Sequence, residues 1–161
     1  MKKFFVKNVQ VATILFVLLS WSLAACGGKD PVAEDLDLVG SAWQGIVSTK
    51  DTNGNVVEVP VGISFLGNSL GRWHFEDDPA AFLFAWNEKK STEPMAESKR
   101  FSTFTYSRSS KKILGMRDFR VLFEFLSLDW IITEFRENSL SLVSRADDTS
   151  RTIWIKLKRI A

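Results

Sequence analysis

The chain has 161 residues, a formal net charge of +2, one cysteine and one histidine. A charge this close to zero gives no basic footprint for nucleic acid, and a lone cysteine excludes an internal disulfide and a cysteine-rich metal site. The length suits one domain with a hydrophobic core, and thirteen phenylalanines and six tryptophans against one tyrosine favour a β core or an apolar pocket.

The first 25 residues have the three parts of a secretory signal peptide. Lys2, Lys3 and Lys7 give a basic start, an uncharged apolar run covers residues 9–19, and small residues precede Cys26. A retained membrane-anchor helix is the alternative. The run is short for a membrane span and no stop-transfer flank follows it, so we expect residues 1–25 to be cleaved.

The residues Leu23-Ala24-Ala25-Cys26 resemble the lipobox of bacterial lipoproteins at all four positions. The resemblance implies diacylglycerol transfer to the Cys26 thiol, cleavage just before Cys26, and anchoring to a membrane outside the cytoplasm. The two or three acyl chains of this family make a firm anchor. The alternative is an ordinary secreted protein with a chance cysteine. Gly27 stands where an aspartate commonly signals retention in the inner membrane, which indicates the outer membrane.

Residues 26–38 are small, acidic or proline and lack apolar periodicity, so they predict a flexible tether. The domain that follows, residues 39–161, reads as short strands separated by turns. Strands are expected at 42–49, 56–59, 61–66, 69–76, 101–107, 111–116, 121–126, 128–136, 139–142 and 152–158. Pro60 predicts a break or an edge, and Asn53-Gly54, residues 108–110 and 147–150 predict turns.

Two segments between the strands are harder to assign. Residues 80–86 are apolar throughout and fit a strand or a helix equally well. Residues 87–100 are polar and predict a long loop with a helical turn, which would lie across one mouth of a barrel as a lid. The pattern as a whole predicts an all-β fold, a small antiparallel barrel of about eight to ten strands, or a sandwich.

The opening Gly40-Ser41-Ala42-Trp43 is similar to the Gly-x-Trp strand of lipocalins and bacterial lipocalin-like domains, with one additional residue between glycine and tryptophan. The order of the later strands, through 153–159, is similar as well. The resemblance implies a lipocalin-like barrel over residues 38–160. It also implies that Trp43 packs across the closed end of the barrel, beneath a late arginine, Arg159 or Arg145. Cation–π attraction explains such a contact.

Six aromatic side chains are candidates for an apolar ligand site inside the barrel. Alternation places them on inward faces of several strands, with Phe101 on an outward face. Trp130 and Ile132 are expected on one face of their strand, with Ile131, Thr133 and Phe135 opposite. The candidates are Phe65, Trp73, Phe75, Phe104, Tyr106 and Trp130.

Catalytic chemistry has little support in the sequence. His74 is the only histidine, there is no Gly-x-Ser-x-Gly elbow, and we expect His74 to face solvent or a polar lining. Residues 76–78 read as a solvated acidic turn, and residues 51–55 lack the later glutamate of a calcium loop. Glu124 and Glu134 are a weak carboxylate pair. We expect neither an enzyme nor a cofactor or metal.

These observations leave three functions open. The leading one is a membrane-anchored, non-enzymatic binding module for an apolar or amphipathic small molecule. The second is a structural or protein-interaction lipoprotein whose barrel is filled by side chains and whose outer surface binds an envelope partner. The third, a hydrolase at the envelope, would require converging carboxylates. The interior of a small barrel either encloses one ligand or is filled by side chains, so the fold alone does not decide between these functions.

Overall fold

The computed structural model describes residues 37–110, 113–119, 123–145 and 152–161. By its contacts the chain separates into residues 1–30 and 31–161, and every described residue belongs to the second unit. The expected signal peptide, the lipobox with Cys26 and the turn at 147–150 lie outside the described residues.

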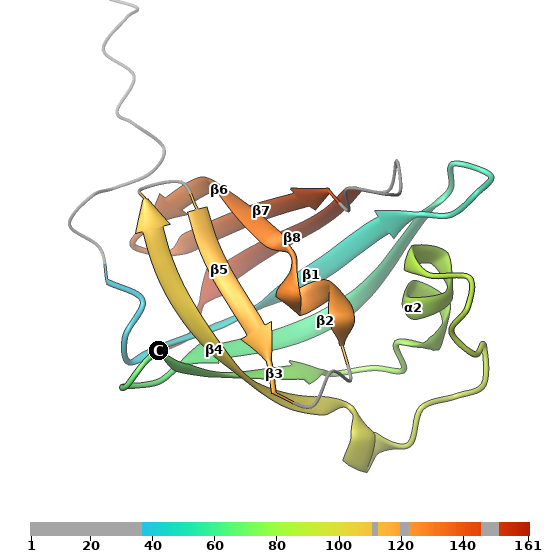
Figure 1. Ribbon diagram of the computed structural model, residues 1–161, viewed down its shortest axis with the longest axis horizontal. Coiled ribbons are helices and arrows are strands. Elements are labelled where there is room, and N and C mark those ends of the chain that lie inside the picture. Colours follow the sequence, from blue (N-terminus) through green and yellow to red (C-terminus); the bar gives the residue numbers. More distant parts are fainter. Residues whose placement is uncertain (1–36, 111–112, 120–122, 146–151) are drawn as a thin grey trace, which may run out of the picture. The chain divides into compact units, whose positions relative to one another are not determined.

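The described residues form a closed antiparallel barrel of eight strands, which confirms the predicted fold class (Figure 1). Each strand pairs with the next along the chain, and β8 pairs with β1 to close the barrel. This up-and-down order is that of lipocalin-type barrels. The strands are β1 (Ser41–Lys50), β2 (Val56–Phe65), β3 (Leu70–Phe75), β4 (Phe101–Ser110), β5 (Ile113–Asp118), β6 (Asp129–Arg136), β7 (Ser139–Arg145) and β8 (Thr152–Arg159).

Three helical segments lie in connections between the described strands. The ambiguous apolar run is helix α2 (Ala80–Trp86), and a 3-10 turn, η1 (Glu97–Lys99), ends the following loop. The strand expected at 121–126 was wrong in the part described, where η2 (Glu124–Ser127) is a second 3-10 turn. Phe123, Phe125 and Leu126 are all buried there. A strand with one inward face cannot bury two consecutive side chains in this way, whereas a tight turn across the barrel can.

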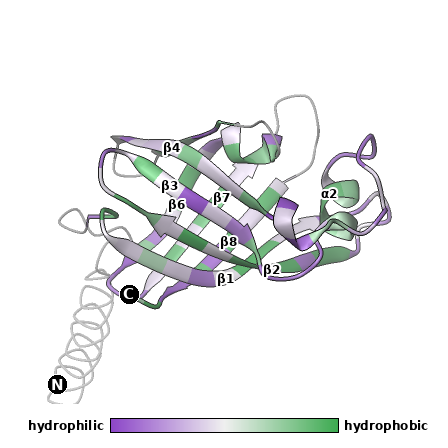
Figure 2. Cartoon of the chain, turned by 90° about the horizontal axis from the view of Figure 1, so that it is seen from below, coloured by the Kyte–Doolittle hydropathy of each residue, from purple (hydrophilic) through white to green (hydrophobic). Residues whose placement is uncertain are grey.

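Alternation along the strands separates the interior from the surface (Figure 2). In β8, Ile153, Ile155 and Leu157 are buried, whereas Lys156 and Lys158 are exposed. Hydrophobic and hydrophilic bands therefore alternate along the ribbons, as a period of two requires. Leu38, assigned to the tether from the sequence, is also buried, so packing of the domain begins one residue earlier than predicted.

Of the break or edge predicted at Pro60, the break is wrong, because β2 continues through it. Pro60 pairs with Ile46 of β1, and its carbonyl accepts a hydrogen bond from the backbone N–H of Glu76 at 3.0 Å. The ladder between β2 and β3 covers only Val61–Phe65 of β2. Pro60 has no N–H to donate toward β3. Because the β2–β3 ladder has ended at this point, no ladder hydrogen bond is lost, and β2 continues at little cost in stability.

Two irregularities in register also correct the predicted pattern. A β-bulge between Ile132 and Glu134 inserts an extra residue in β6, which turns Phe135 inward although simple alternation placed it outward. A second shift, between Arg108 and Ser110, lets β4 continue through the segment that was predicted as a turn. The interior therefore gains one large ring, that of Phe135.

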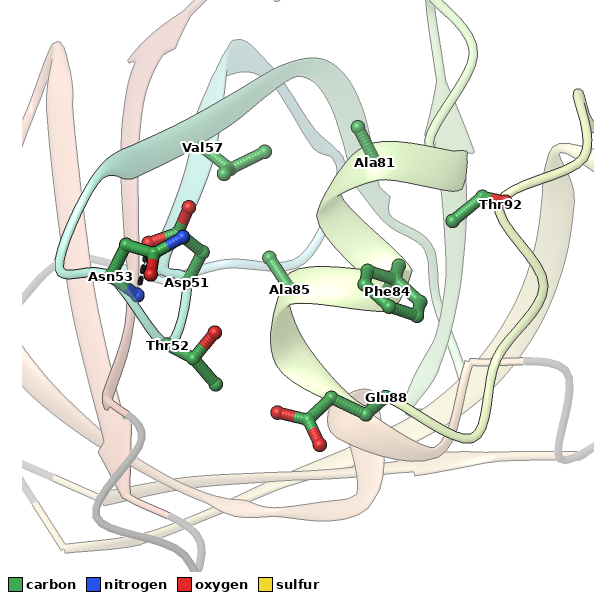
Figure 3. A pocket seen from close by; sticks show the side chains of 9 residues that line it. All are labelled: Asp51, Thr52, Asn53, Val57, Ala81, Phe84, Ala85, Glu88 and Thr92. Atoms are coloured by element: carbon green, nitrogen blue, oxygen red, sulfur yellow. Dashed lines mark hydrogen bonds between the residues drawn. The ribbon is translucent and has the colours of Figure 1, made fainter.

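The barrel has two ends with different coverings. The chain enters at one of them, here called the tether end, where Leu38, Trp43 and Arg159 lie. The connections that contain α2 and η2, together with the β1–β2 hairpin, lie at the opposite end, here called the helix end (Figure 1). At the helix end α2 packs beside β1 and β2, and the hairpin faces it (Figure 3).

Candidate functional site

The six predicted ligand-binding aromatics are all buried, and five of them lie in two groups of touching rings. Phe65, Phe104 and Tyr106 form the group nearer the tether end. The ring centre of Phe65 lies 6.0 Å from that of Phe104 and 5.0 Å from that of Tyr106, both edge to face. The Tyr106 hydroxyl donates to the carbonyl of Leu66 at 3.1 Å, so its polar atom is paired within the protein.

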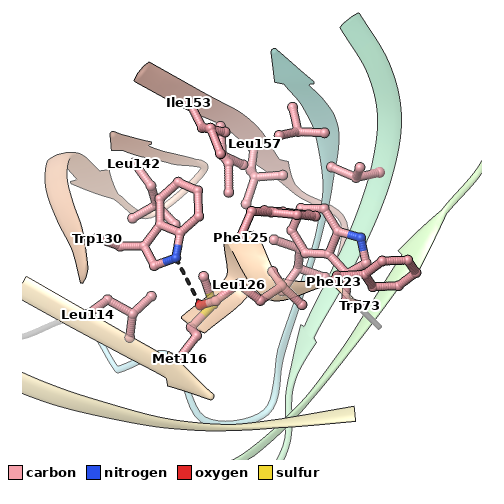
Figure 4. Packing of buried hydrophobic residues seen from close by; sticks show 14 of the residues in the cluster. Trp73, Leu114, Met116, Phe123, Phe125, Leu126, Trp130, Leu142, Ile153 and Leu157 are labelled. Atoms are coloured by element: carbon pink, nitrogen blue, oxygen red, sulfur yellow. Dashed lines mark hydrogen bonds between the residues drawn. The ribbon is translucent and has the colours of Figure 1, made fainter. Parts of the chain in front are cut away.

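The second group joins Trp73 and Phe75 to two rings of the η2 segment, and Figure 4 shows Trp73 beside Phe123 and Phe125. The ring centre of Trp73 is 5.4 Å from those of Phe75 and Phe125, and Phe75 is 4.9 Å from Phe123. Phe123 and Phe125 come from the segment around η2, which sequence reasoning had placed in a strand. They pack between the rings that were expected to face a ligand.

Trp130, the sixth candidate, is fully buried and is fixed by the η2 segment. Its indole N–H donates to the carbonyl of Leu126 at 3.1 Å (Figure 4). Trp73 differs, because its indole N–H is buried and has no hydrogen-bond acceptor among the described residues. The structure therefore brings the six candidates together as a packed core, and Trp73 alone carries an unused polar atom in it.

Aromatic side chains of α2 and η2 cover the helix end. The ring centre of Phe82 is 5.4 Å from that of Phe125 and 6.1 Å from that of Phe75, and Trp86 is 5.9 Å from Phe125. The polar loop expected to act as a lid lies beside this cover, since Lys90 forms an ion pair with Glu124 at 3.3 Å. A ligand entering here would have to displace α2 or η2.

A buried carboxylate holds the η2 segment against the barrel wall. Asp118, 5% exposed, accepts a hydrogen bond from the hydroxyl of Ser102 and a second from the backbone N–H of Phe123 at 2.8 Å. Its own backbone N–H donates to Ser127 at 3.3 Å. Hydrogen bonds to a buried carboxylate are strong because the interior dielectric is low. Asp118 therefore fixes the position of the η2 segment, whose buried side chains Phe123, Phe125 and Leu126 are here called the η2 plug.

The tether end has the contact that the lipocalin resemblance implied. The guanidinium of Arg159 lies 5.8 Å from the ring centre of Trp43, which is 1% exposed and pairs with Arg159 across the β1–β8 ladder. The indole N–H of Trp43 donates to the Ser41 hydroxyl at 2.7 Å. Gly40 takes a positive φ of 74° just before the strand, a conformation that favours glycine.

The polar residues singled out from the sequence lie apart from one another. His74 faces outward and stacks on Phe101 with a centroid distance of 4.6 Å. Glu76 accepts a hydrogen bond from Gln44 on the same outer face. Glu134 bonds with Ser139 and Arg136. Within the described ranges no three or more His, Cys, Asp or Glu side chains form a group that could hold a metal ion.

The carboxylate of Asp51 organises the β1–β2 turn through hydrogen bonds within the turn. Asp51 accepts hydrogen bonds from the backbone N–H groups of Asn53 and Asn55 at 2.9 and 2.8 Å, and from the Asn55 amide at 3.0 Å. These bonds lower the pKa of Asp51. The carboxylate thus organises its own hairpin and remains negatively charged.

A surface pocket of about 620 Å³ lies between this hairpin and α2 (Figure 3). We call it the hairpin–helix pocket. The hairpin contributes Asp51, Thr52, Asn53 and Val57, and the helix side contributes Ala81, Phe84, Ala85 and Glu88, with Thr92 beyond them. Its volume falls within the range of about 300–1,000 Å³ that is common for ligand pockets.

The pocket is lined by both apolar and polar side chains, including two carboxylates, Asp51 and Glu88. Phe84 is 41% exposed although it is a large hydrophobic side chain, and Ala81 is exposed beside it. Asp51 and Glu88 stand on opposite sides of the opening (Figure 3). Apolar side chains with a few polar groups among them are the usual lining of a binding site.

No protein-family model matches the chain, and a search of curated proteins finds no match either. In the part of the chain that the structure describes, no helix has the length and apolarity needed to cross a membrane.

The hairpin–helix pocket was not predicted from the sequence, although the sequence contains a signal for half of it. Ala81, Phe84, Ala85 and Glu88 follow the spacing i, i+3, i+4 and i+7, which places them on one face of a helix. Because the apolar run fitted a strand equally well, this face was not recognised. The hairpin half comes from a segment about thirty residues earlier in the sequence, and no local pattern connects the two.

Proposed function

We propose that this chain is a lipid-anchored, non-enzymatic interaction module of the bacterial cell envelope. In this proposal Cys26 carries the lipid, residues 27–37 are the tether, and the filled barrel is a rigid scaffold. The hairpin–helix pocket is the surface that binds a protein partner. Gly27 after the lipidated cysteine supports placement at the outer membrane.

The observation that carries the proposal is the position of the hairpin–helix pocket at the helix end. The chain enters the barrel at the tether end, so the pocket lies at the end away from the attachment point (Figure 1). A module anchored through residues before Asp37 would leave the pocket open to partners, because the described chain joins the barrel at the opposite end. The packing of the aromatic core supports the scaffold role, since a filled small barrel has no need of a ligand for stability.

Photo-crosslinking in cells tests the interaction module. A crosslinking amino acid replaces Phe84 in the pocket or, as a matched control, Phe101, which is 50% exposed on the outer face of β4. We expect a specific crosslinked partner from position 84 and none from position 101. The Ala81→Trp substitution, which fills the pocket from an exposed position, should abolish the product. Equal products at both positions, or persistence with Ala81→Trp, would contradict the proposal.

The lipid anchor has its own test. The intact mass of the membrane-extracted protein should show loss of residues 1–25 and the addition of acyl chains on Cys26. Cys26→Ala should release an unlipidated product or leave an uncleaved one. An unmodified Cys26 in the membrane-extracted protein would refute the anchor and leave the pocket proposal to be judged separately.

One observation favours a second function, the binding of an apolar or amphipathic small molecule inside the barrel. Trp73 offers a buried indole N–H without an acceptor among the described residues, and a ligand oxygen would satisfy it. Native mass spectrometry of the membrane-extracted protein, released from detergent, tests this function. A bound molecule that disappears with Trp73→Phe, which removes the N–H alone, would support it. A single unliganded mass would exclude it.

A further inference from the structure

The outer faces of β3, β4 and β5 carry two large exposed hydrophobic side chains at neighbouring positions. These strands are consecutive in the barrel and form one part of its wall (Figure 1). Phe101, at the start of β4, is 50% exposed, and Phe119, directly after β5, is 60% exposed. Single exposed hydrophobic side chains are common, whereas adjacent ones mark surfaces that contact a partner or a membrane. We call the outward side chains of these strands, together with Phe119, the β3–β5 face.

The register of the strands places three rings in one row on this face. The backbone N–H of Phe119 donates to the carbonyl of Thr103 at 3.2 Å, so Phe119 lies beside Thr103 of β4. Phe101 is two residues from Thr103 and shares its face, which makes Phe101 and Phe119 diagonal neighbours, about 7–8 Å apart. On the other side His74 of β3 pairs with Phe101 and stacks on it, with ring centres 4.6 Å apart. The three rings thus cross the face from β3 to β5.

Two arginines border the row of rings on one side. Arg72 pairs with Thr103 from β3, and Arg117 pairs with Thr105 from β5; both arginines are exposed. Each precedes its ring by two residues on strands that run in the same direction, so both lie on the same side of the row. Among the described outward side chains of these strands there is no aspartate or glutamate, because Asp118 is buried. The β3–β5 face is therefore positively charged.

The carboxylates just outside these strands do not cancel this charge. Glu76, which follows β3, accepts a hydrogen bond from the amide of Gln44 in β1 at 2.7 Å, which directs its carboxylate away from β4 and β5. Glu97 and Lys99 both belong to η1, before β4, and both are exposed, so their opposite charges balance. Arg72 and Arg117 remain as the net charge of this part of the surface.

Exposed rings beside arginines match the chemistry of an anionic phospholipid bilayer. A guanidinium forms paired hydrogen bonds with phosphate, and an aromatic ring gains free energy on leaving water for the region below the headgroups. Anionic lipids attract each nearby cation further. In the proposed function the lipid on Cys26 holds the domain beside such a surface permanently, so even a weak contact is populated because its effective concentration is high.

The chain before the described residues is long enough for this contact. Residues 27–36 separate Cys26 from Asp37, and they span at most roughly 35 Å, at about 3.3–3.6 Å per residue. A ten-residue strand such as β1 is about 33 Å long. The tether can therefore reach as far as the barrel is long, so the wall of the barrel, and not only its tether end, can lie against the membrane.

We propose that the β3–β5 face lies on the anionic surface of the membrane that holds the lipid anchor, with Phe101 and Phe119 at the headgroups and with Arg72 and Arg117 on lipid phosphates. This inference rests on the anchor of the proposed function and adds the orientation of the barrel. No lining residue of the hairpin–helix pocket belongs to β3, β4 or β5, so the contact leaves that pocket open.

A fluorophore at the bilayer surface tests the orientation in the membrane-extracted protein. Thr103→Cys places a thiol at the centre of the β3–β5 face, and Ser48→Cys places one on the outer face of β1, three strands away around the barrel. Cys26 is alkylated in the proposed function, so only the new thiol reacts with a nitrobenzoxadiazole label. Each variant is reconstituted into vesicles of phosphatidylcholine and phosphatidylglycerol that contain a nitroxide-labelled phospholipid as quencher.

We expect strong quenching of the label at position 103 and little at position 48. Replacing phosphatidylglycerol with phosphatidylcholine, or raising the salt concentration, should weaken the quenching at position 103, because the charge attraction is lost or screened. Equal quenching at both positions would show that the barrel has no preferred face on the membrane. That result, or quenching at position 103 that ignores both lipid charge and salt, would overturn the inference.

Substitutions in the Thr103→Cys protein separate the charges from the rings. Arg117→Gln should lower the ratio of docked to undocked protein by about fivefold, the factor for one cation near an anionic membrane surface. Phe119→Ser should lower this ratio at every salt concentration, because burial of apolar area does not depend on charge. Arg136→Gln removes an equal charge from an exposed position of β6 and should change nothing. An effect of Arg136→Gln as large as that of Arg117→Gln would contradict a specific face.

The anchor and the orientation fail in different ways. An unmodified Cys26 would react with the label and would refute the anchor, whereas a lipidated Cys26 without preferential quenching at position 103 would refute the orientation alone. Self-quenching between labels at position 103 that grows with protein concentration, without quenching by the nitroxide lipid, would identify a second copy of this chain as the occupant. A protein crosslinked from position 101 would identify a protein partner there, and either result would overturn the membrane contact.

Discussion

Trp43 connects the first and last strands at the tether end of the barrel. Its indole is buried, hydrogen-bonded to Ser41 and covered by the Arg159 guanidinium. We predict that Trp43→Ala lowers the free energy of unfolding by about 3–5 kcal/mol, as truncation of a large buried aromatic does. Arg159→Ala should cost less, about 0.5–2 kcal/mol, because it removes only the cation–π contact and some packing. Urea denaturation followed by circular dichroism measures both, and an unchanged midpoint for Trp43→Ala would contradict its place in the core.

Tyr106 is the only tyrosine of the chain, so the titration of its phenol can be measured without a signal from another tyrosine. Burial raises the pKa of its phenol above 10.0, and the negative charge of Asp37 raises it further. The neutral phenol is thus favoured in the folded state. Its contribution to stability is complete below the ordinary pKa and is lost as the pH rises through the raised one.

Ultraviolet absorbance of the phenolate checks this prediction. In the folded protein the transition should lie above pH 10.0, and Asp37→Asn should move it downward by removing the nearby negative charge. Unfolding the protein in urea should return it to the ordinary value. A folded-state transition at or below the unfolded one would show that Tyr106 is not held in the interior.

Among the elements, the η2 plug depends on one carboxylate, that of Asp118. Asp118→Ala should leave the Phe123 N–H and the Ser102 hydroxyl without their partner and cost about 1.5–3 kcal/mol, the range for hydrogen bonds to a charged group. Hydrogen exchange of the Phe123 amide should accelerate beyond the change in global stability. Asp129→Ala, at an exposed position of β6, is the matched control and should change stability by about 0.5 kcal/mol or less. Equal effects of the two would argue against the plug.

Regular strands could be read from the sequence, whereas elements that break alternation could not. Ile153, Ile155 and Leu157 alternate with polar residues because β8 has one buried and one exposed face, and this alternation predicted the strand. Phe123 and Phe125 have the same spacing but belong to a helical connection, because tertiary packing and not local periodicity decides their conformation. The bulge before Phe135 inverts a face without any signal in residue type. The pocket escaped prediction for a similar reason, since it joins two segments that meet only in the fold.

On the scale of the whole molecule, the barrel closes through the β1–β8 ladder, and Gly45 lies where the backbones of the two strands leave no room for a Cβ atom. A Cβ on Gly45 would lie 2.0 Å from the Lys156 carbonyl oxygen and 2.9 Å from the Leu157 Cα. Both atoms belong to the backbone, so Gly45→Ala must separate the two strands.

We predict that Gly45→Ala destabilises the fold by about 1–3 kcal/mol or more, as overpacking does. The Gly67→Ala control, where a Cβ meets nothing within 4 Å, should change stability by about 0.5 kcal/mol or less. Thermal unfolding of both variants decides the matter. A Gly45→Ala protein as stable as the control would mean that β1 and β8 are farther apart than described here.

The same ladder has a consequence for the order in which the chain can fold. β1 lacks one of its two neighbours until β8 has been synthesised, so the barrel closes only after all eight strands are available. Pairing between segments so distant in sequence is slow, because the entropy of a long loop must be lost before any contact compensates it. If the chain is exported as proposed, the β1–β8 ladder can form only after β8 has crossed the membrane, so closure of the barrel would follow translocation.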